Sequence, residues 1–342
     1  MPEKQDASQR ADALHEEGMK KSDAGDEDGA LALYLEALAL DHNRPNTLYN
    51  VGLAYKYRRD WEKSLRYNLQ SLELRADSEA TNWNAGIAAT ALGRWDVARA
   101  AWKRLGMEMP EGDGPIDANF GYTPVRLNGF EETDDAVEVV WAYRRSPVTA
   151  AIDNIPTPAA RYRFGDLVLH DGAATGRRDD GQGNDCPVFN VFQLLEPSKY
   201  ITHDVVLMAP DAAAIDSLRQ ACEEAEVAFE DWTTMRVICK ACSEGREHDQ
   251  HELIQPGETW EVARRVGIAA LDTAIVEGVL EDWCAGGEGR SVDSVEAWSL
   301  SPPPRRWKPG CAPTISRSPS SGSRSTRRTR ACPASPRRRR WT

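Results

Sequence analysis

Small and large side chains recur at matched positions along the first third of the chain, at an interval of 34 residues. Small residues at fixed depths allow two helices to approach closely. The recurring sets are Gly18, Gly52 and Gly86; Ala30, Ser64 and Ala98; and the mostly large Tyr34, Asn68 and Trp102. A further set, Gly25, Arg59 and Gly93, falls where a turn would join two helices. The pattern predicts three helix pairs over residues 11–110.

A single helix pair cannot bury its apolar face, so units of this kind must stack. The segments LYNVGLAYKYRRDWEKSLRYNLQSLEL and NWNAGIAATALGRWDVARAAWKRL closely resemble tetratricopeptide repeats. The resemblance covers residues 11–110 and implies an all-α solenoid of three helix pairs. The first unit departs most from the pattern, because Glu17 and Lys21 replace apolar or aromatic residues. Residues 1–10 are polar, and we expect them to be disordered.

The resemblance also implies a concave, peptide-binding groove lined by the first helix of each pair. The groove positions would be His15 and Met19; then Tyr49, Asn50, Leu53, Lys56 and Tyr57; then Trp83, Asn84, Ile87 and Thr90. Asn50 and Asn84 share one phase, and an amide there can bond to a peptide backbone. Alternatively, Tyr49 and Trp83 pack between repeats, and the two asparagines cap local structure.

Chaperone tails are disfavoured as partners by the same comparison. Members of the family that bind chaperones hold a C-terminal carboxylate with a clamp. This clamp expects Lys and Asn in the first unit, Asn in the second, and Lys and Arg in the third. The matching residues here are His15, Met19, Asn50, Ala80 and Asn84. Only Asn50 fits, so we expect that chaperone C-terminal carboxylates do not bind.

The residue pattern changes after Pro110, where the segment EGDGP ends the helical periodicity. Runs of β-branched and aromatic residues, separated by Gly, Pro, Asn and Asp, predict a small β-rich module over residues 111–199. Its expected strands are residues 137–141, 161–164 and 166–169.

Residues 200–300 predict an α+β module. Its expected strands are residues 201–208, 233–241, 260–269 and 292–298, and Asp211 and Asp272 are N-cap candidates for two helices. Apolar residues recur at helical spacing after each cap: Ile215, Leu218, Cys222 and Ala225, then Val276, Val279, Leu280 and Trp283. The order βαββαβ predicts a ferredoxin-like fold, with helices on one face of the sheet and the other face free for function.

Charge is distributed unevenly along the 342 residues. Residues 301–342 contain twelve of the 42 basic residues and no acidic one, which leaves 30 basic and 54 acidic residues before them and a net charge of −24. The acidic body would repel nucleic acid, whereas the Arg-, Ser- and Pro-rich tail would attract it. We expect the tail to be disordered. An altered reading frame also explains its abrupt loss of acidic residues.

A cluster of potential metal ligands follows the second expected strand of the α+β module. Cys239, Cys242, His248 and His251 have the spacing C-x2-C-x5-H-x2-H, and two thiolates with two imidazoles complete a tetrahedral shell for zinc. Four protein ligands leave no open position, which favours a structural site. The alternatives are a buried and a free cysteine beside solvated histidines, or a C-x2-C redox pair.

These features favour a modular protein that docks a peptide or protein partner through its repeat groove rather than an enzyme. The competing hypothesis is a metal-dependent enzyme or a metal or redox sensor that uses the Cys/His cluster. Nucleic-acid binding is expected only through the basic tail. The N-terminus lacks a secretory apolar segment, and no apolar run reaches membrane-spanning length, so we expect a cytoplasmic protein with no membrane contact.

Overall fold

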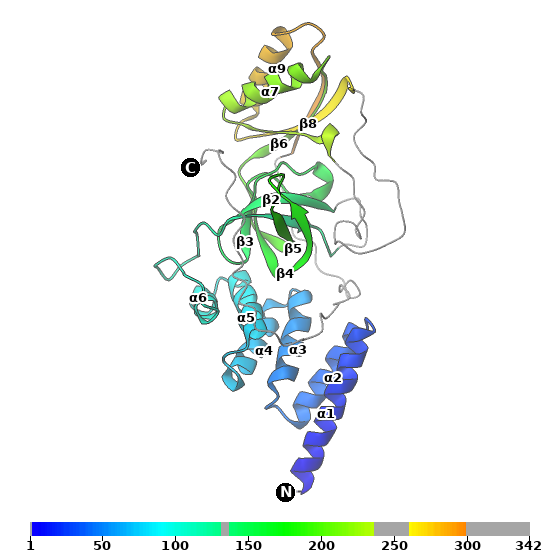
Figure 1. The fold of residues 1–342 in the computed structure, drawn as a ribbon, viewed down its shortest axis with the longest axis vertical. Helices are drawn as coiled ribbons and strands as arrows, with labels where there is room; N and C mark the ends of the chain where they lie inside the picture. Colours follow the sequence, from blue (N-terminus) through cyan, green and yellow to red (C-terminus); the bar gives the residue numbers. More distant parts are fainter. Residues whose placement is uncertain (1, 131–136, 236–259, 299–342) are drawn as a thin grey trace. The chain divides into compact units, whose positions relative to one another are not determined.

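The computed structural model describes residues 2–130, 137–235 and 260–298 (Figure 1). These residues form two compact units, one of residues 2–118 with 146–148 and one of residues 119–145 with 149–298. Within the described ranges, no helix combines the length and the apolar character that a membrane span requires.

The first unit is built from consecutive helices that associate in pairs, as the 34-residue interval predicts. The pairs are α1 (Pro2–Asp23) with α2 (Glu27–Leu40), α3 (Pro45–Tyr57) with α4 (Trp61–Leu74), and α5 (Glu79–Ala91) with α6 (Trp95–Arg104). The prediction of a three-repeat helical array is confirmed.

The start of α1 corrects the expectation for the N-terminus. The helix begins at Pro2, so residues 2–10 are helical rather than disordered. Proline is well tolerated at the first helical position, because its missing N–H would have no intrahelical acceptor there. Residues 3–10 contain neither glycine nor a second proline and include several good helix formers, so nothing in them ends the helix.

Each helix pair closes at a glycine, as the recurring small residues predict. A Cβ atom added to Gly18 would lie 2.6 Å from the ring of Tyr34, and one on Gly52 would lie 2.5 Å from the amide of Asn68. A Cβ atom added to Gly86 would likewise clash with the indole of Trp102. Real Cβ atoms do not approach other atoms so closely, so the large residue of one helix fills the space that the glycine leaves in the other.

The turns within the pairs explain the fourth recurring set. Gly25, Arg59 and Gly93 have φ values of 83°, 57° and 67°, in the left-handed region that favours glycine. Asp26 and Asp60 follow two of these turns, and their side chains accept hydrogen bonds from backbone N–H groups in the first turn of α2 and α4. The α1–α2 turn and the α3–α4 turn therefore share one design, in which a left-handed residue is followed by an aspartate that caps the next helix.

The β-rich part of the second unit is a closed five-stranded barrel. Its strands are β1 (Tyr122–Leu127), β2 (Glu138–Arg144), β3 (Thr149–Ile152), β4 (Leu167–Asp179) and β5 (Asp185–Glu196). Neighbours along the chain pair antiparallel, and β1 pairs parallel with β5 to close the barrel. Alternate apolar residues such as Val125, Leu127 and Val168 form its core.

The expected strand at residues 161–164 is wrong. A short 3-10 helix, η2 (Pro158–Ala160), precedes it, and Arg161 adopts a left-handed conformation with φ of 60°. The Arg163 side chain donates to the carbonyl oxygens of Ser198 and Tyr200, while its backbone N–H donates to Asp166. This segment is therefore a connection held by long-range hydrogen bonds rather than a strand.

Strands and helices alternate in the C-terminal part of the second unit. The elements are β6 (Ile201–Met208), α7 (Ala212–Glu224), β7 (Ala228–Asp231), β8 (Ala263–Ala270), α9 (Thr273–Ala285) and β9 (Ser291–Trp298). The sheet order is β7-β8-β6-β9, and all of its pairs are antiparallel. Asp211 and Asp272 cap α7 and α9, as predicted.

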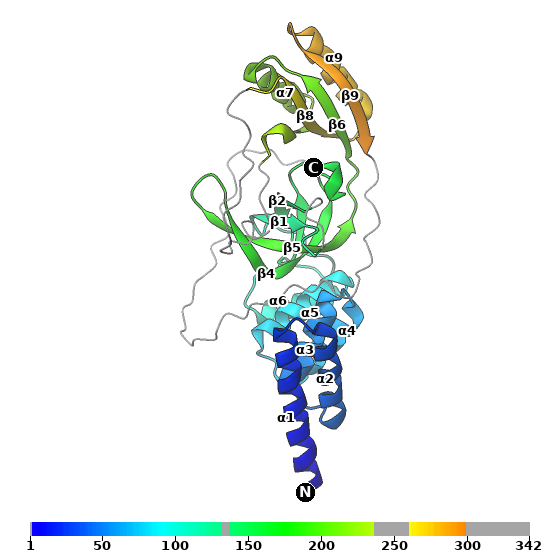
Figure 2. The ribbon, with the colours of Figure 1, turned by 90° about the vertical axis from the view of Figure 1, so that its right-hand side faces the viewer.

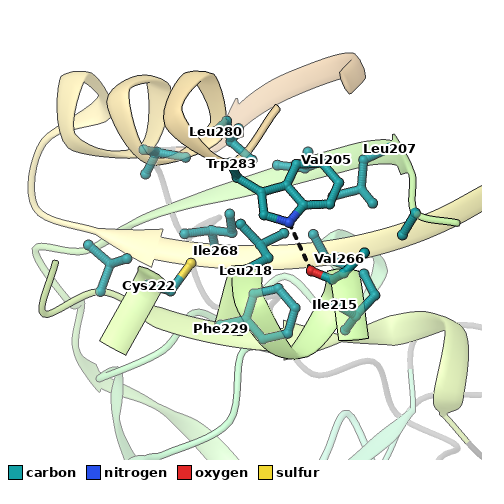
Figure 3. Packing of buried hydrophobic residues seen from close by; sticks show 14 of the residues in the cluster. Val205, Leu207, Ile215, Leu218, Cys222, Phe229, Val266, Ile268, Leu280 and Trp283 are labelled. Atoms are coloured by element: carbon teal, nitrogen blue, oxygen red, sulfur yellow. Dashed lines mark hydrogen bonds between the residues drawn. The ribbon is translucent and has the colours of Figure 1, made fainter. Parts of the chain in front are cut away.

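The two helices cover one face of this sheet (Figure 3). The core between them contains Val205, Leu218, Ile268 and Leu280, and the Trp283 indole donates to the carbonyl of Ala214 across the helix pair. The apolar positions predicted from helical spacing thus form the interior. Burial of side chains of this size is the dominant favourable contribution to folding.

The second expected strand lies elsewhere than predicted. The strand is residues 228–231, and it ends where the Asp231 carboxylate accepts the N–H of Thr233 and opens the 3-10 helix η3 (Trp232–Thr234). Residues 236–241 of the predicted strand lie outside the described residues.

The second face of the sheet was expected to be free, and part of it is covered. The Trp232 indole lies over Gly267, where an added Cβ would clash with it, and its Nε1 donates to the carbonyl of Ile155, 2.8 Å away. Ile155, Phe164 and Trp232 are buried together, with Tyr200 packed against them. The connection between β3 and β4 of the barrel therefore shares a small core with the sheet.

Candidate peptide-binding face

The predicted groove residues lie on the first helix of each pair. Asn50 on α3 and Asn84 on α5 precede Gly52 and Gly86 by two residues, which is about 200° around an α-helix. Because each glycine faces the partner helix, each asparagine lies on the side of its helix turned away from that partner.

Asn84 has an unmet hydrogen-bonding group. Asn84 is 4% exposed, and its Nδ2 has no hydrogen-bond partner within the described structure. Asn50, one repeat earlier, is 8% exposed. A buried amide donor without an acceptor is uncommon in native proteins and calls for an explanation, such as a ligand that supplies the acceptor.

Two other asparagines in the array have evident structural roles. Asn82 Nδ2 donates to the carbonyl oxygens of Ala76 and Ser78, each at 2.9 Å, and so holds the start of α5. Asn68 Nδ2 donates to the carbonyl of Ser64 at 2.8 Å. The Nδ2 groups of Asn82 and Asn68 therefore have acceptors, whereas Asn84 Nδ2 and the Oδ1 atoms of Asn82 and Asn68 have no partner within the described structure.

Several of the predicted contact residues take part in the packing of the array. Trp83 meets Trp102 edge to face, with ring centroids 5.2 Å apart, and Ile87 is buried. The Thr90 hydroxyl donates to the carbonyl of Gly86. The contact of Trp83 with Trp102 lies within one helix pair, α5 with α6, and not between repeats. Tyr49 and Leu53 are half-buried.

The face also carries polar and cationic groups. Lys56 is buried, and its Nζ lies 4.4 Å from the ring centroid of Tyr57, which is a cation–π distance. His15 Nδ1 lies 2.9 Å from the Thr47 hydroxyl, which joins α1 to α3. Thr47 is absent from the predicted groove positions, although Thr81 repeats it at the 34-residue interval and signals an equivalent position.

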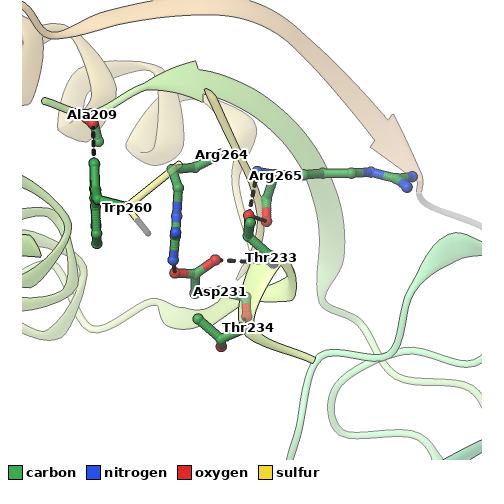
Figure 4. Close-up of polar contacts among 7 residues, drawn as sticks. All are labelled: Ala209, Asp231, Thr233, Thr234, Trp260, Arg264 and Arg265. Carbon is green, nitrogen blue, oxygen red and sulfur yellow. Dashed lines mark hydrogen bonds and ion pairs between the residues drawn. The ribbon is translucent and has the colours of Figure 1, made fainter. Parts of the chain in front are cut away.

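Cys239, Cys242, His248 and His251 lie outside the described residues, and so does the basic tail. The described chain on either side of the Cys/His segment is tied together (Figure 4). Arg264 forms a buried ion pair with Asp231 and stacks on Trp260, whose indole donates to the carbonyl of Ala209. Thr233 Oγ1 accepts the N–H of Arg265.

Burial favours the neutral form of the described histidines of the second unit. Burial, followed by the charge of Arg144, lowers the pKa of His170 to about 3. Its Nδ1 lies 2.8 Å from the Asp171 carbonyl oxygen, so Nδ1 carries the proton of the neutral ring. Burial also lowers the pKa of His203, whose Nε2 lies 3.1 Å from the Thr273 hydroxyl. Among the described residues, no three His, Cys, Asp or Glu side chains gather as metal ligands.

No family model and no curated protein matches the chain. Solved structures similar to it include the second TPR domain of Spaghetti (RPAP3) bound to the HSP90 peptide SRMEEVD, with 21% identity and a TM-score of 0.30 over 32% of this chain and 100% of that one. Another is yeast Tom70, with 25% identity and a TM-score of 0.27 over 28% of this chain and 20% of that one. A third is the Sgt2 TPR domain from Aspergillus fumigatus, with 21% identity and a TM-score of 0.26 over 28% and 62%. The first unit, with its three helix pairs, is the part of this chain that is similar to TPR domains.

Proposed function

We propose that this protein binds an extended segment of a partner protein along α1, α3 and α5. The observation that carries the proposal is the buried Asn84 Nδ2 donor, which has no acceptor and lies on the side of α5 turned away from α6. A backbone carbonyl of a bound peptide would supply that acceptor. Asn50 offers a second amide at the same phase one repeat earlier, which suits a chain whose backbone acceptors recur along the array.

The remaining candidate residues divide by role under this proposal. Tyr49, Leu53 and Tyr57 flank Asn50 on α3 and would add contact area for side chains of the peptide. Lys56 would add positive charge. Trp83 and Ile87 would hold α5 in position, because they pack within the fold.

The test measures peptide binding with matched amide variants. A display library of extended peptides is selected on the immobilised full chain, and the affinity of a selected peptide is measured by fluorescence polarisation. We expect N84A to weaken binding about tenfold, which corresponds to about 1.4 kcal/mol. The control is Q70A, which removes an exposed amide from α4 and should leave the affinity unchanged. Equal affinities of N84A and the unmodified chain would remove Asn84 from the site.

We further propose that chaperone C-terminal peptides bind poorly to this array. The first and second TPR domains of Spaghetti are each bound to SRMEEVD in their structures. Of the clamp positions in this chain, Asn50 alone carries the expected residue, so the carboxylate of that peptide would lack its basic partners. We expect no saturable binding of SRMEEVD by calorimetry. Binding that N50A abolishes would contradict this expectation.

We further propose a structural zinc ion held by Cys239, Cys242, His248 and His251. The support is the ligand spacing, together with the contacts of Asp231, Arg264 and Trp260, which hold the chain on both sides of the segment. The same ligands could serve a metal-dependent enzyme or a sensor. We favour a structural role over these two alternatives, because four protein ligands leave no open coordination position.

Metal analysis of the full chain tests the zinc proposal. Protein purified under reducing, chelator-free conditions should contain one zinc per chain, and C242A should lose the metal and melt at a lower temperature. The control is C284A, which removes a half-buried cysteine from α9 and should keep the metal. Absence of metal from the unmodified chain would end the proposal.

Two assignments complete the proposed organisation. We infer that residues 200–300 form a ferredoxin-like module, because the sheet order β7-β8-β6-β9 places the first and third strands at its centre. The fold alone assigns no activity. For residues 301–342 we propose either a basic binding tail or the product of an altered reading frame, and sequencing independent clones of the coding DNA would decide between them.

A further inference from the structure

The peptide-binding face of the array is largely closed. Five of its predicted positions are at most 8% exposed: Asn50, Lys56, Asn84, Ile87 and Thr90. A face that is open to a peptide keeps a patch of its contact residues in solvent, because the peptide itself supplies their cover. Burial of these positions therefore requires a cover from the chain itself.

The cover is most evident on α5. Residues 84–90 are all buried, which is close to two full turns of the helix. A helix that packs on its neighbours along one stripe keeps its opposite side in solvent, and α5 packs against α6, α4 and α3 (Figure 2). Burial on every side indicates contact with a segment outside these helices.

The equivalent residues of α3 are more exposed. Leu53, Ala54 and Tyr55 are half-buried, whereas the residues 34 positions later, 87–89, are buried. Helix α3 belongs to the middle repeat and α5 to the last one, so the helix with fewer neighbouring repeats has the greater burial. Stacking of the repeats alone would produce the opposite difference.

Among the described residues, the first unit contains two segments besides its helices and the turns between them: 105–118 and 146–148. In the first segment Ile116 alone is buried. In the second segment every residue is buried, and Ser146 and Val148 are only 2% and 0% exposed. The second segment is therefore the better candidate for the cover of α5.

This segment, Ser146–Val148, is the tip of the connection between β2 and β3, and it belongs to the first unit although both strands belong to the second. Connections between strands normally lie at the surface, so a fully buried tip is unusual. The Val148 N–H donates to Ser146 Oγ at 3.2 Å, and the Arg145 N–H donates to the Thr149 carbonyl at 2.9 Å. These bonds fix the shape of the tip in advance, so its binding costs little conformational entropy.

We propose that the β2–β3 tip occupies the α5 end of the peptide-binding face and that a partner segment binds by displacing it. The inference rests on the function proposed above, because it assigns the regulation of the same face. The tip is tethered, so its effective concentration at the face is about millimolar. The tip is also small and uncharged, so the space that it leaves would take small, uncharged side chains of the partner.

A partner can displace the tip because the tip leaves the hydrogen bonding of the face incomplete. Asn84 Nδ2 has no acceptor within the described structure, so a partner carbonyl there would form a bond that the tip does not form. The tip weakens partner binding in proportion to the time for which it is in place. Occupancy for about nine-tenths of the time weakens the apparent affinity about tenfold.

Hydroxyl-radical footprinting of the full chain tests the contact without a partner. The variant S146G/P147G/V148G removes the side chains of the tip, and we expect the oxidation of Ile87 to rise severalfold. The control is Q182G, which creates the same run of glycines in the exposed connection between β4 and β5 and should leave Ile87 protected. Protection of Ile87 in the triple variant would overturn the proposal.

Two further measurements separate loss of the contact from loss of folding. Leu218, in the core of the α+β module, should stay protected in the triple variant and in the control. Photo-leucine in place of Val148 keeps an apolar side chain at the tip, and illumination should cross-link it to residues 79–91. Cross-links to other segments alone would contradict the proposed contact, whatever the triple variant does.

The peptide selected on the immobilised chain measures the effect on binding. The triple variant should bind it about tenfold more tightly than the unmodified chain, and Q182G should bind it equally well. Equal affinities with a protected Ile87 would remove the tip from the face and leave the proposed function standing. Absence of any binding peptide, with Ile87 oxidised in the triple variant, would reject the proposed function and keep the contact of the tip.

Discussion

The indole of Trp102 on α6 occupies the space that a side chain on Gly86 of α5 would need. The pair is sixteen residues apart in the sequence and repeats as Gly52 with Asn68 and as Gly18 with Tyr34. A glycine in the interior of a helix costs about 1 kcal/mol relative to alanine. The array accepts this cost three times because the helices of each pair could not otherwise approach.

We therefore expect G86A to destabilise the array despite the better helix propensity of alanine. The added methyl group would have to displace a buried indole, and overpacking of this kind typically costs about 1–3 kcal/mol. Urea unfolding of the full chain, followed by far-UV circular dichroism, should show the helical transition at a lower denaturant concentration. An unchanged midpoint would mean that Trp102 can move without cost.

Gly278 on α9 is a helical glycine in the opposite situation, and G278A should be stabilising. A Cβ atom added there would meet nothing within 4 Å. The substitution should raise the free energy of unfolding of the second unit by about 0.5–1 kcal/mol, because it adds helix propensity without strain. The same urea experiment measures this effect. A loss of stability would show that another part of the chain, or a second copy, approaches α9 closely.

Arg99 should hold the chain that follows the array. Its guanidinium donates to the carbonyl oxygens of Pro110, Gly114 and Pro115, at 2.7, 3.0 and 3.3 Å. R99M keeps most of the apolar stem and removes all three donors, so we expect it to cost about 2–3 kcal/mol. R99K should lose less, because one ammonium can still donate.

Hydrogen exchange provides the readout for the Arg99 variants. Protection in α6 should fall in R99M, and limited proteolysis should cut within residues 110–115 sooner than in the unmodified chain. If R99M and R99K exchange like the unmodified protein, the three hydrogen bonds contribute nothing measurable to the stability of this segment.

The buried His170 should make the second unit less stable as the pH falls. Its folded pKa of about 3 lies below the unfolded value of 6.5, so the unfolded chain binds a proton that the folded chain does not. The free energy of unfolding should therefore decrease as the pH falls below 6.5, by at most about 1.4 kcal/mol per pH unit from this group.

The variant H170Q tests this assignment, because glutamine does not titrate. Urea unfolding between about pH 7 and about pH 5 should show a shallower pH dependence for H170Q than for the unmodified chain. His203, whose pKa burial also lowers, keeps part of the slope in the variant and acts in the same direction. Parallel pH profiles would show that the ring of His170 becomes protonated within the folded protein.

The parts of the fold that the sequence predicts well depend on contacts between residues close in the chain. The helix pairs follow from glycines and large residues sixteen positions apart, and Asp211 and Asp272 cap helices that begin immediately after them. Strand β6 was also predicted with its observed bounds, because Ile201–Met208 lies between clear turn signals.

The failures involve residues whose environment comes from distant segments. Residues 161–164 resemble a strand in composition, yet Arg163 turns its side chain toward carbonyl groups about 35 positions later. The ring of Trp232 packs on the sheet because Gly267 leaves room for it and the Ile155 carbonyl accepts a hydrogen bond from its indole N–H. Neither partner is visible in a local pattern.

The candidate site shows the same limit at the level of single residues. The 34-residue interval identifies Asn50 and Asn84 as equivalent positions, but it does not distinguish a satisfied amide from an unsatisfied one. Asn84 Nδ2 has no acceptor within the described structure, whereas Nδ2 of the neighbouring Asn82 donates to the carbonyl oxygens of Ala76 and Ser78. Only three-dimensional positions show it.

The small core formed by Ile155, Phe164 and Trp232 determines where the chain can be divided in the laboratory. A fragment that starts at Tyr200 would lack Ile155 and Phe164 and would leave the apolar ring of Trp232 exposed to contact with other molecules. A fragment that starts near Asn119 keeps the barrel and the sheet together, so the small core between them stays intact. Gene fusions and isotope-labelled fragments should therefore use the boundary near Asn119.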